Sequence, residues 1–267
     1  EEDLAPLAVL AQLSDPHVGV GRGDRDSANA LTAAVEQVKR LKPGPRAVIV
    51  TGDLVTDPSA ATYERVRELL SPLSPPVFVI AGNHDDRDAL REYFALAGRD
   101  TGSVGAPFQY SVEVGDLRVV VCDSTIPGHE EGSFDRERRA WLATELAVAP
   151  EAPTIVAIHH PPVPTSFPAF DEIGLPEADR AGLAELLTIN PQVRRVICGH
   201  VHRALFEVLA GCGVAVCPST WLQSPLEIGM TEIHLNPEPP AFMVHATTDG
   251  GVISHVQPIS AARARAL

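Results

Sequence analysis

Five short apolar runs share one feature: each ends in glycine, proline or histidine together with side chains that can bind a metal. The first run, Leu7–Leu13, stops at Ser14-Asp15-Pro16-His17. Because proline cannot continue a ladder of backbone hydrogen bonds, we expect Asp15 and His17 at the carboxyl end of a buried strand. The other runs and their polar ends are Ala47–Val50 with Thr51-Gly52-Asp53, Val77–Ile80 with Ala81-Gly82-Asn83-His84-Asp85, Thr154–Ile158 with His159-His160, and Arg195–Cys198 with Gly199-His200-Val201-His202.

Amphipathic segments lie between and around these runs. In Ser27–Leu41, for example, apolar side chains recur three and four positions apart, which is the spacing of one helix face. Ser59 stands where a helix would begin and is expected to cap it. The predicted helices are Ser27–Leu41, Ser59–Leu70, Asp86–Ala97, Asp135–Leu146 and Glu177–Leu187.

Strand-type patterns dominate the remaining segments. Gly115-Asp116 joins the runs Tyr110–Val114 and Leu117–Val121, which predicts an antiparallel hairpin. The segment Val163–Ile173 shows no regular pattern, and we expect it to be a loop. Further short strands are predicted at Ala204–Leu209, Val214–Val216, Met230–Leu235, Ala241–Ala246 and Val252–Val256.

The order of these elements predicts the fold class. Strands that alternate with helices, followed by a strand-rich last third, favour an α/β fold with two sheets packed face to face and helices outside. The chain has 267 residues, of which 45% are hydrophobic, enough for one large core. We therefore expect a single domain over residues 1–267, with its core at about residues 7–256. Ligands of open α/β sheets collect at the carboxyl ends of strands, where every polar cluster above is predicted to lie.

Charge and apolar content exclude two classes of partner. A formal net charge of −14 repels polyanions, so we expect no binding to nucleic acid polymers. The apolar runs are far shorter than the ~20 residues that a membrane span needs, and no signal segment opens the chain. We expect a cytoplasmic protein, although the start at Glu1 leaves a removed leader open.

The cysteines point to a reduced core and not to a disulfide framework. Four are scattered along the chain, at Cys122, Cys198, Cys212 and Cys217. Cys122 and Cys198 end apolar runs, so buried thiols are the favoured interpretation. A bridge between Cys212 and Cys217 is the alternative.

The polar strand ends together form a candidate metal site. Each residue alone has an ordinary explanation, such as a turn aspartate or a histidine with satisfied hydrogen bonds. Nitrogen and oxygen donors without thiolate suit manganese, iron, zinc or magnesium. Seven donors exceed what one open ion needs, and they suit two ions ~3.5–4 Å apart that share a carboxylate. The candidate ligands are Asp15, His17, Asp53, Asn83, His159, His200 and His202.

The order of these motifs resembles a known family. Asp-x-His, Gly-Asp, Gly-Asn-His-Asp, His and Gly-His-x-His, in this sequence and over about Leu7–Val256, resemble the calcineurin-like metallophosphoesterase superfamily. Two longer stretches, Asp-Ser-Thr-Ile-Pro-Gly-His from Asp123 and His-His-Pro-Pro-Val-Pro from His159, look like bacterial class III cyclic nucleotide phosphodiesterases and glycerophosphodiesterases. The resemblance implies a four-layer αββα sandwich of two mixed sheets.

The same resemblance implies a role for each residue. Asp15, His17 and His202 would hold one metal ion, Asn83, His159 and His200 the other, and Asp53 would bridge them. The ions would be manganese or iron, with zinc, cobalt or magnesium as alternatives. The residues closest to the chemistry would be His84, Asp53 and Asn83, with His84 acting near the phosphate without binding a metal. His160 has no assigned role, and Asp85 is expected to orient a histidine.

The implied reaction is hydrolysis of small phosphodiesters by in-line attack of a metal-bound hydroxide. The expected substrates are 3′,5′-cyclic nucleotides (cAMP and cGMP), with glycerophosphodiesters or a broader range of phosphomono- and diesters as the alternative. Segments Asp123–Gly132 and Val163–Ile173, together with the region near Trp221, would form the substrate walls. A metal-free interaction module is the alternative from another class, and relatives of this kind often form homodimers.

Overall fold

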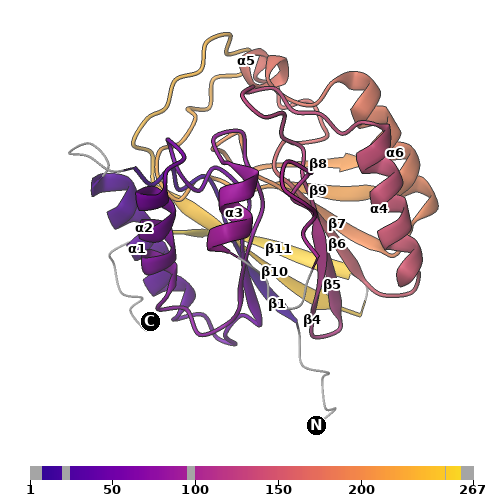
Figure 1. Ribbon diagram of the computed structural model, residues 1–267, viewed down its shortest axis with the longest axis horizontal. Helices are drawn as coiled ribbons and strands as arrows, with labels where there is room; N and C mark the ends of the chain where they lie inside the picture. The colour runs from indigo at the N-terminus through magenta and orange to yellow at the C-terminus, as the bar shows by residue number, and fades with distance from the viewer. Residues whose placement is uncertain (1–7, 20–24, 95–99, 250, 260–267) are drawn as a thin grey trace.

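The computed structural model describes residues 8–19, 25–94, 100–249 and 251–259. A leader before Glu1 and the last residues of the helix predicted to reach Ala97 lie outside these ranges. Two mixed β-sheets pack face to face, with helices α1 and α2 on one outer side and α4 and α6 on the other (Figure 1). The predicted α/β sandwich of four layers is therefore confirmed.

The first sheet has five strands in the order β11-β10-β1-β2-β3. Strands β1, β2 and β3 run parallel, so their carboxyl ends share one edge, whereas β10 runs antiparallel to β1. The strands are β1 (Val9–Leu13), β2 (Ala47–Val50), β3 (Val77–Val79), β10 (Ala241–Thr248) and β11 (Gly251–Pro258).

The second sheet has six strands in the order β4-β5-β6-β7-β9-β8. Its four central strands are parallel, and the two edge strands are antiparallel to their neighbours. Strands β4 and β5 form the predicted hairpin. The strands are β4 (Tyr110–Val114), β5 (Leu117–Cys122), β6 (Thr154–Ile158), β7 (Val193–Cys198), β8 (Leu205–Leu209) and β9 (Cys212–Val216).

Helices connect the parallel strands, and α2 begins at Ser59, where the sequence predicts a cap. At the start of α2, the Ser59 side chain accepts from the backbone of Thr62, and the Thr62 side chain accepts from the backbone of Ser59. The helices are α1 (Arg25–Val38), α2 (Ala60–Leu70), α3 (Arg87–Tyr93), α4 (Arg136–Val148), α5 (Pro168–Glu172) and α6 (Glu177–Ile189).

Strand β5 shows how the layers separate. Val119 and Val121 point into the core between the two sheets, whereas Val120 and Cys122 point toward α4 and α6. This period of two is what a strand buried on both faces requires. The sandwich holds both rims of parallel strand ends at fixed positions.

The predictions for two segments were wrong. Met230–Leu235 forms no strand; within the described chain it is irregular, and Ile233 there is 44% exposed. An alternating pattern without a partner strand cannot form a ladder. The segment Val163–Ile173 contains the short helix α5, which begins with Pro168 at a position where proline is favoured.

Two further expectations can be compared with the described residues. All four cysteines are free and buried, as the favoured interpretation predicts, so Cys212 and Cys217 are not bridged. Within the described ranges, no helix is long and apolar enough to cross a bilayer.

Candidate metal centre

The structure brings the seven predicted donor residues together from five strand ends. Asp15 and His17 follow β1, Asp53 follows β2 and Asn83 follows β3, all in the first sheet. From the second sheet, His159 follows β6, and both His200 and His202 follow β7. The two parallel rims meet because the sheets pack face to face.

One donor group contains Asp15, His17, Asp53 and His202, whose ligand atoms all lie within 4.8 Å of one another. Nε2 of His17 and Nε2 of His202 are only 3.0 Å apart. Nε2 of His202 lies 3.7 Å from Oδ1 of Asp15. We call this the first donor group.

A second group gathers around Asn83. Its Oδ1 lies 3.1 Å from Nε2 of His159 and 3.1 Å from Nδ1 of His200. Asp53 stands between the two groups, because its Oδ2 is 3.5 Å from Nε2 of His17 and 3.6 Å from Nε2 of His159. A carboxylate in this position faces both sets of donors. We call Asn83, His159 and His200 the second donor group.

Hydrogen bonds to the backbone orient two of these rings. His159 donates from Nδ1 to the carbonyl of Thr51 at 2.8 Å, and His202 donates from Nδ1 to the carbonyl of Leu222 at 3.0 Å. Each bond occupies Nδ1 and leaves Nε2 directed into the site, the usual arrangement for a histidine that binds metal.

The backbone at the site is strained. Five of the seven donor residues have a left-handed backbone, a conformation that costs a residue other than glycine about 1–3 kcal/mol. Their φ angles are 48° at Asp15, 44° at His17, 50° at Asp53, 72° at His200 and 55° at His202. Only two other non-glycine residues of the described chain share this conformation, Ser166 and Ala210. The strain is concentrated where side chains converge, as is typical of functional sites.

Close packing of the backbone supports the same arrangement. A Cβ at Gly82 would collide with the backbone nitrogen and carboxylate of Asp53, and a Cβ at Gly52 would collide with the ring of His159. Glycine is therefore required at both positions, so that the strand ends can approach one another.

Burial and the contact between Asp53 and the neighbouring histidines set the protonation states of the site. Burial would raise the pKa of Asp53, but the neighbouring His159 holds it well below its ordinary value. Burial lowers the pKa of His159, yet the Asp53 carboxylate more than offsets this and raises it to about 9. Burial lowers the pKa of His17 to about 3. Asp53 is thus an anion and His17 is neutral, which are the protonation states that a metal requires, and metal binding would displace the proton that Asp53 draws onto His159.

The residues present fit metal ions. Nε2 of His200 is buried and has no hydrogen-bond partner among the described residues. A metal ion in the second donor group would take Nδ1, the nitrogen that faces Asn83, and the ring proton would then be on Nε2. The donors are nitrogen and oxygen atoms only, as hard or borderline divalent ions prefer.

His84 lies beside the donors without joining either group. Its Nδ1 is 3.1 Å from the carbonyl of Thr56, which fixes the ring, and the ring meets that of His17 edge to face at 4.9 Å. His84 and Asn83 also line a cavity of 430 Å³, whose lining includes Thr125 and Ile126 as well. His84 can therefore contact a molecule held in this cavity.

Asp85 does not orient a histidine, contrary to the expectation. Its carboxylate accepts from the backbone nitrogens of Gly82 and Leu54, at 3.0 and 3.2 Å, and from the hydroxyl of Tyr63 at 3.4 Å. It holds the turn that presents Asn83 and His84.

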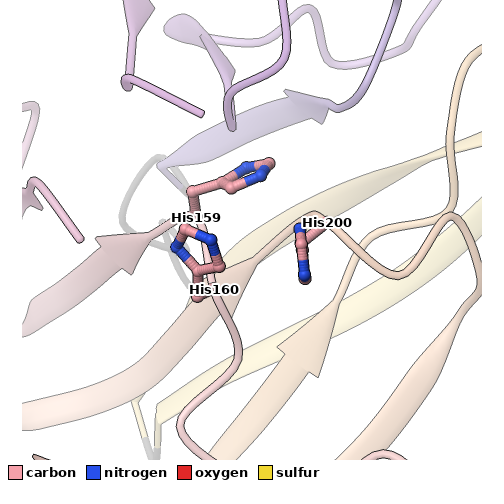
Figure 2. Close-up of side chains that lie close together, drawn as sticks. All are labelled: His159, His160 and His200. Carbon is pink, nitrogen blue, oxygen red and sulfur yellow. The ribbon is translucent and has the colours of Figure 1, made fainter. Parts of the chain in front are cut away.

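His160 lies close to the second donor group but is engaged elsewhere. Figure 2 shows its ring with those of His159 and His200, and its ring centroid is 4.6 Å from that of His200. Its Nδ1 is 2.8 Å from the Ser124 hydroxyl and its Nε2 is 3.1 Å from the carbonyl of Glu130. Both ring nitrogens are therefore used to hold the segment Asp123–Gly132.

A buried ion pair that the sequence does not reveal holds the same segment from the other side. Arg87 at the start of α3 pairs with Asp123 at 2.7 Å and donates to Thr125. Asp123 also accepts from the backbone nitrogen of Phe108. The cavity wall is thus tied to α3 and to the residues that precede β4.

Comparison with known proteins agrees with this geometry. Residues 8–204 match the model of the family described as Calcineurin-like phosphoesterase. The chain is 35% identical to the 3′,5′-cyclic adenosine monophosphate phosphodiesterase CpdA of Pseudomonas aeruginosa, over 80% of this chain and 77% of that protein. It is 30% identical to the glycerophosphodiester phosphodiesterase GpdQ of Enterobacter lignolyticus, over 89% of this chain and 86% of that protein.

Solved structures show the same fold at low identity. A dimetal phosphatase from Danio rerio superposes with a TM-score of 0.68 at 16% identity, covering 96% of this chain and all of that one. A purple acid phosphatase from yellow lupin seeds gives 0.68 at 15% identity, covering 98% of this chain and 53% of that one. At such identities the likeness concerns the fold alone.

Proposed function

The chain belongs to the calcineurin-like phosphoesterase family, and we propose that it hydrolyses small phosphodiesters at two metal ions, with 3′,5′-cyclic nucleotides as its substrates. One observation carries the proposal: the Asp53 carboxylate lies between two groups of nitrogen and oxygen donors. A shared carboxylate is what a pair of ions acting on one phosphate requires.

The first donor group would hold one ion and the second donor group the other, with Asp53 common to both. Manganese and iron suit this mixture of imidazole, carboxylate and amide oxygen, and zinc, cobalt or magnesium are the alternatives. When bound, such ions lower the pKa of coordinated water and neutralise charge that develops on the phosphoryl oxygens.

His84 would supply the proton for the leaving oxygen. Because its Nδ1 faces the carbonyl of Thr56, that nitrogen carries a proton in either charge state. The second proton of the imidazolium is then on Nε2, from which it can pass to the alkoxide as the phosphorus–oxygen bond breaks. Asn83 is a neutral donor, so it leaves the charge of its ion undiminished.

The cavity and the charge of the molecule favour a small substrate. The cavity beside His84 has a volume of 430 Å³, within the range typical of sites for small molecules. A net charge of −14 disfavours long polyanions, whereas one phosphodiester group can be neutralised locally. The four free cysteines fit a reducing compartment, and we place the enzyme in the cytoplasm.

Glycerophosphodiesters are the second candidate class. The observation in their favour is the long match to the GpdQ protein, which covers 86% of that relative. The matches to cyclic nucleotide phosphodiesterases include, besides CpdA, a cAMP/cGMP dual specificity enzyme of Mycobacterium tuberculosis at 32% identity.

A substrate panel tests the proposal. The values of kcat/KM for 3′,5′-cyclic AMP, 2′,3′-cyclic AMP, glycerophosphoethanolamine and bis(p-nitrophenyl) phosphate should be measured with added Mn²⁺. We expect 3′,5′-cyclic AMP to give the highest value among the three natural diesters. A higher value for glycerophosphoethanolamine would select the second class, and activity on the synthetic diester alone would contradict both.

A further inference from the structure

Three polar side chains lie within the apolar core, on or directly after strands that are otherwise apolar. Gln12 is on β1, His245 is on the adjacent strand β10, and Thr51 follows β2. All three have 0% solvent exposure. Burying such groups is unfavourable unless each finds hydrogen-bond partners, so their partners indicate their role.

The side-chain amide of Gln12 fixes the direction of the hydrogen bonds. Its Nε2 lies 2.8 Å from the backbone oxygen of Cys198, which can only accept, and 2.9 Å from Oγ1 of Thr51. Its Oε1 is therefore the atom that faces Nε2 of His245, at 2.8 Å. That ring nitrogen must carry the proton.

His245 extends the chain to the outer strand of the sheet. Burial, with smaller contributions from Arg195 and His255, lowers the pKa of His245 to about 3, so the ring is neutral. With its proton on Nε2, the ring accepts at Nδ1 from the Ser254 hydroxyl of β11, 2.8 Å away.

Beyond Thr51 the same direction continues toward the metal centre. Thr51 donates to the Ser14 hydroxyl at 2.7 Å, closer than its other acceptor, the carbonyl of Leu13, at 3.3 Å. Ser14 donates to Oδ2 of Asp15 at 2.6 Å. Every donor from Ser254 to Ser14 thus points toward Asp15, and hydrogen bonds aligned in this way strengthen one another.

The final bond sets the rotation of the Asp15 carboxylate. The backbone nitrogen of His200 lies 3.1 Å from both oxygens and so does not distinguish them. The Ser14 hydroxyl engages Oδ2 alone, which leaves Oδ1 facing Nε2 of His202 in the first donor group.

We propose that these five side chains, which we call the core chain, position Asp15 for metal binding and so set the affinity of the first donor group for its ion. The core chain consists of Ser254, His245, Gln12, Thr51 and Ser14. The inference rests on the proposed function, because it needs metal ions at the site. Apolar side chains of similar volume would stabilise the core at least as well, so a fully bonded polar chain that ends on Asp15 points to a role at the ligand.

Titration of metal-free protein with Mn²⁺ by calorimetry tests the core chain. Thr51→Val keeps the shape of the side chain and removes its hydroxyl, whereas Thr51→Ser keeps the hydroxyl. We expect Thr51→Val to weaken the binding of one of the two ions about tenfold and to leave the other unchanged, as loss of a group that orients a ligand commonly does. Thr51→Ser should restore wild-type affinity.

Changes farther along the chain provide the second arm and the control. His245→Leu should weaken the same ion, and His245→Gln, which retains a donor and an acceptor, should weaken it less. Thr247→Val is the matched control, since Thr247 carries a buried hydroxyl on β10 that accepts from the backbone of Ala8 and, within the described chain, is not hydrogen-bonded toward Asp15. It should leave both affinities unchanged.

The outcomes separate the two proposals. If the wild type binds two ions and Thr51→Val binds both as tightly, the core chain has no such role and the proposed function stands. Equal weakening of both ions by Thr51→Val and Thr247→Val would likewise overturn the core chain, because that pattern reports general destabilisation. If the wild type binds no ion, the proposed function fails, and the core chain fails with it.

Discussion

At the residue scale, the metal centre needs side chains that only residues other than glycine supply, on a backbone conformation that favours glycine. Asp15, His17, Asp53, His200 and His202 all have positive φ angles, although none is glycine. Their side chains reach a common point from strand ends that turn sharply, and the left-handed backbone provides the turn. Packing in the surrounding sandwich holds these residues in conformations that they would not adopt alone.

This strain predicts an unusual order of stability among variants. In metal-free protein, His202→Gly should be more stable than His202→Ala by about 1 kcal/mol, because alanine retains the strain at a φ of 55° and glycine does not. Urea unfolding measures the difference. The same pair of changes at His160, which is not among the residues with positive φ, should give the opposite order. A more stable alanine variant at position 202 would contradict the role assigned to strain.

Substitutions at His84 and Asp53 should affect metal binding and kcat differently. His84→Ala should retain two metal ions and lower kcat for cyclic AMP about 10²–10⁴-fold, the usual contribution of a proton donor. With bis(p-nitrophenyl) phosphate, whose leaving group needs little protonation, the loss should be much smaller. Asp53→Ala should lose metal and all activity together. An equal loss of kcat on both substrates in His84→Ala would contradict proton donation.

At the element scale, the strand ends carry both the site and its substrate wall. The segment Asp123–Gly132 after β5 is held by His160 from β6 and by Arg87 from α3. Thr125 and Ile126 of this segment line the same cavity as His84, so these contacts also hold that part of the cavity lining in place. We expect a wall anchored in this way to select substrates by shape.

His160 should consequently act on substrate binding. His160→Ala should keep both metal ions and raise KM for the natural diester more than it lowers kcat, because the wall loses its anchor. Metal analysis together with steady-state kinetics checks this, and Ser124→Ala, which removes the partner of Nδ1, should show the same split. Loss of one ion in His160→Ala would identify His160 as a ligand instead.

His245 couples the packing of β10 against β1 to pH. The pKa of His245 is about 3 in the folded protein and about 6.5 in the unfolded chain. Between these pH values the ring binds a proton in the unfolded chain but not in the folded protein. Its contribution to stability is therefore complete above pH 6.5 and is lost as pH falls toward 3. The free energy of unfolding of wild type relative to His245→Gln should fall by about 1.4 kcal/mol per pH unit in this window. Urea unfolding of metal-free protein at several pH values tests this; parallel curves would contradict it.

Elements with a local signal could be predicted from the sequence, and elements that depend on distant partners could not. Each metal-donor residue follows an apolar run, so its position at the end of a strand could be predicted from the sequence. Met230–Leu235 has a strand-like pattern, but whether a partner strand lies beside it is not encoded locally. The bond between Gln12 and His245 joins positions 233 residues apart. Its signal was a glutamine and a histidine inside buried apolar strands, which indicates a partner without naming it.

At the scale of the whole molecule, the two sheets bring distant parts of the chain to one rim. Asp15 and His202 lie at opposite ends of the matched region and in different sheets, and only face-to-face packing places them together. The single domain over residues 1–267 and the homodimer stay predictions. Edge strand β8 exposes Phe206 and Val208, at 54% and 61%, and is a place to examine if dimers form.

The binuclear centre is the central claim, and a metal titration followed by activity tests it most directly. Mn²⁺ should be added stepwise to metal-free protein while bound metal and hydrolysis of a phosphodiester are measured on the same sample. We predict that two ions bind per chain and that full activity appears only as the second ion binds. Full activity in metal-free protein, or saturation of both binding and activity at one ion per chain, would contradict the account.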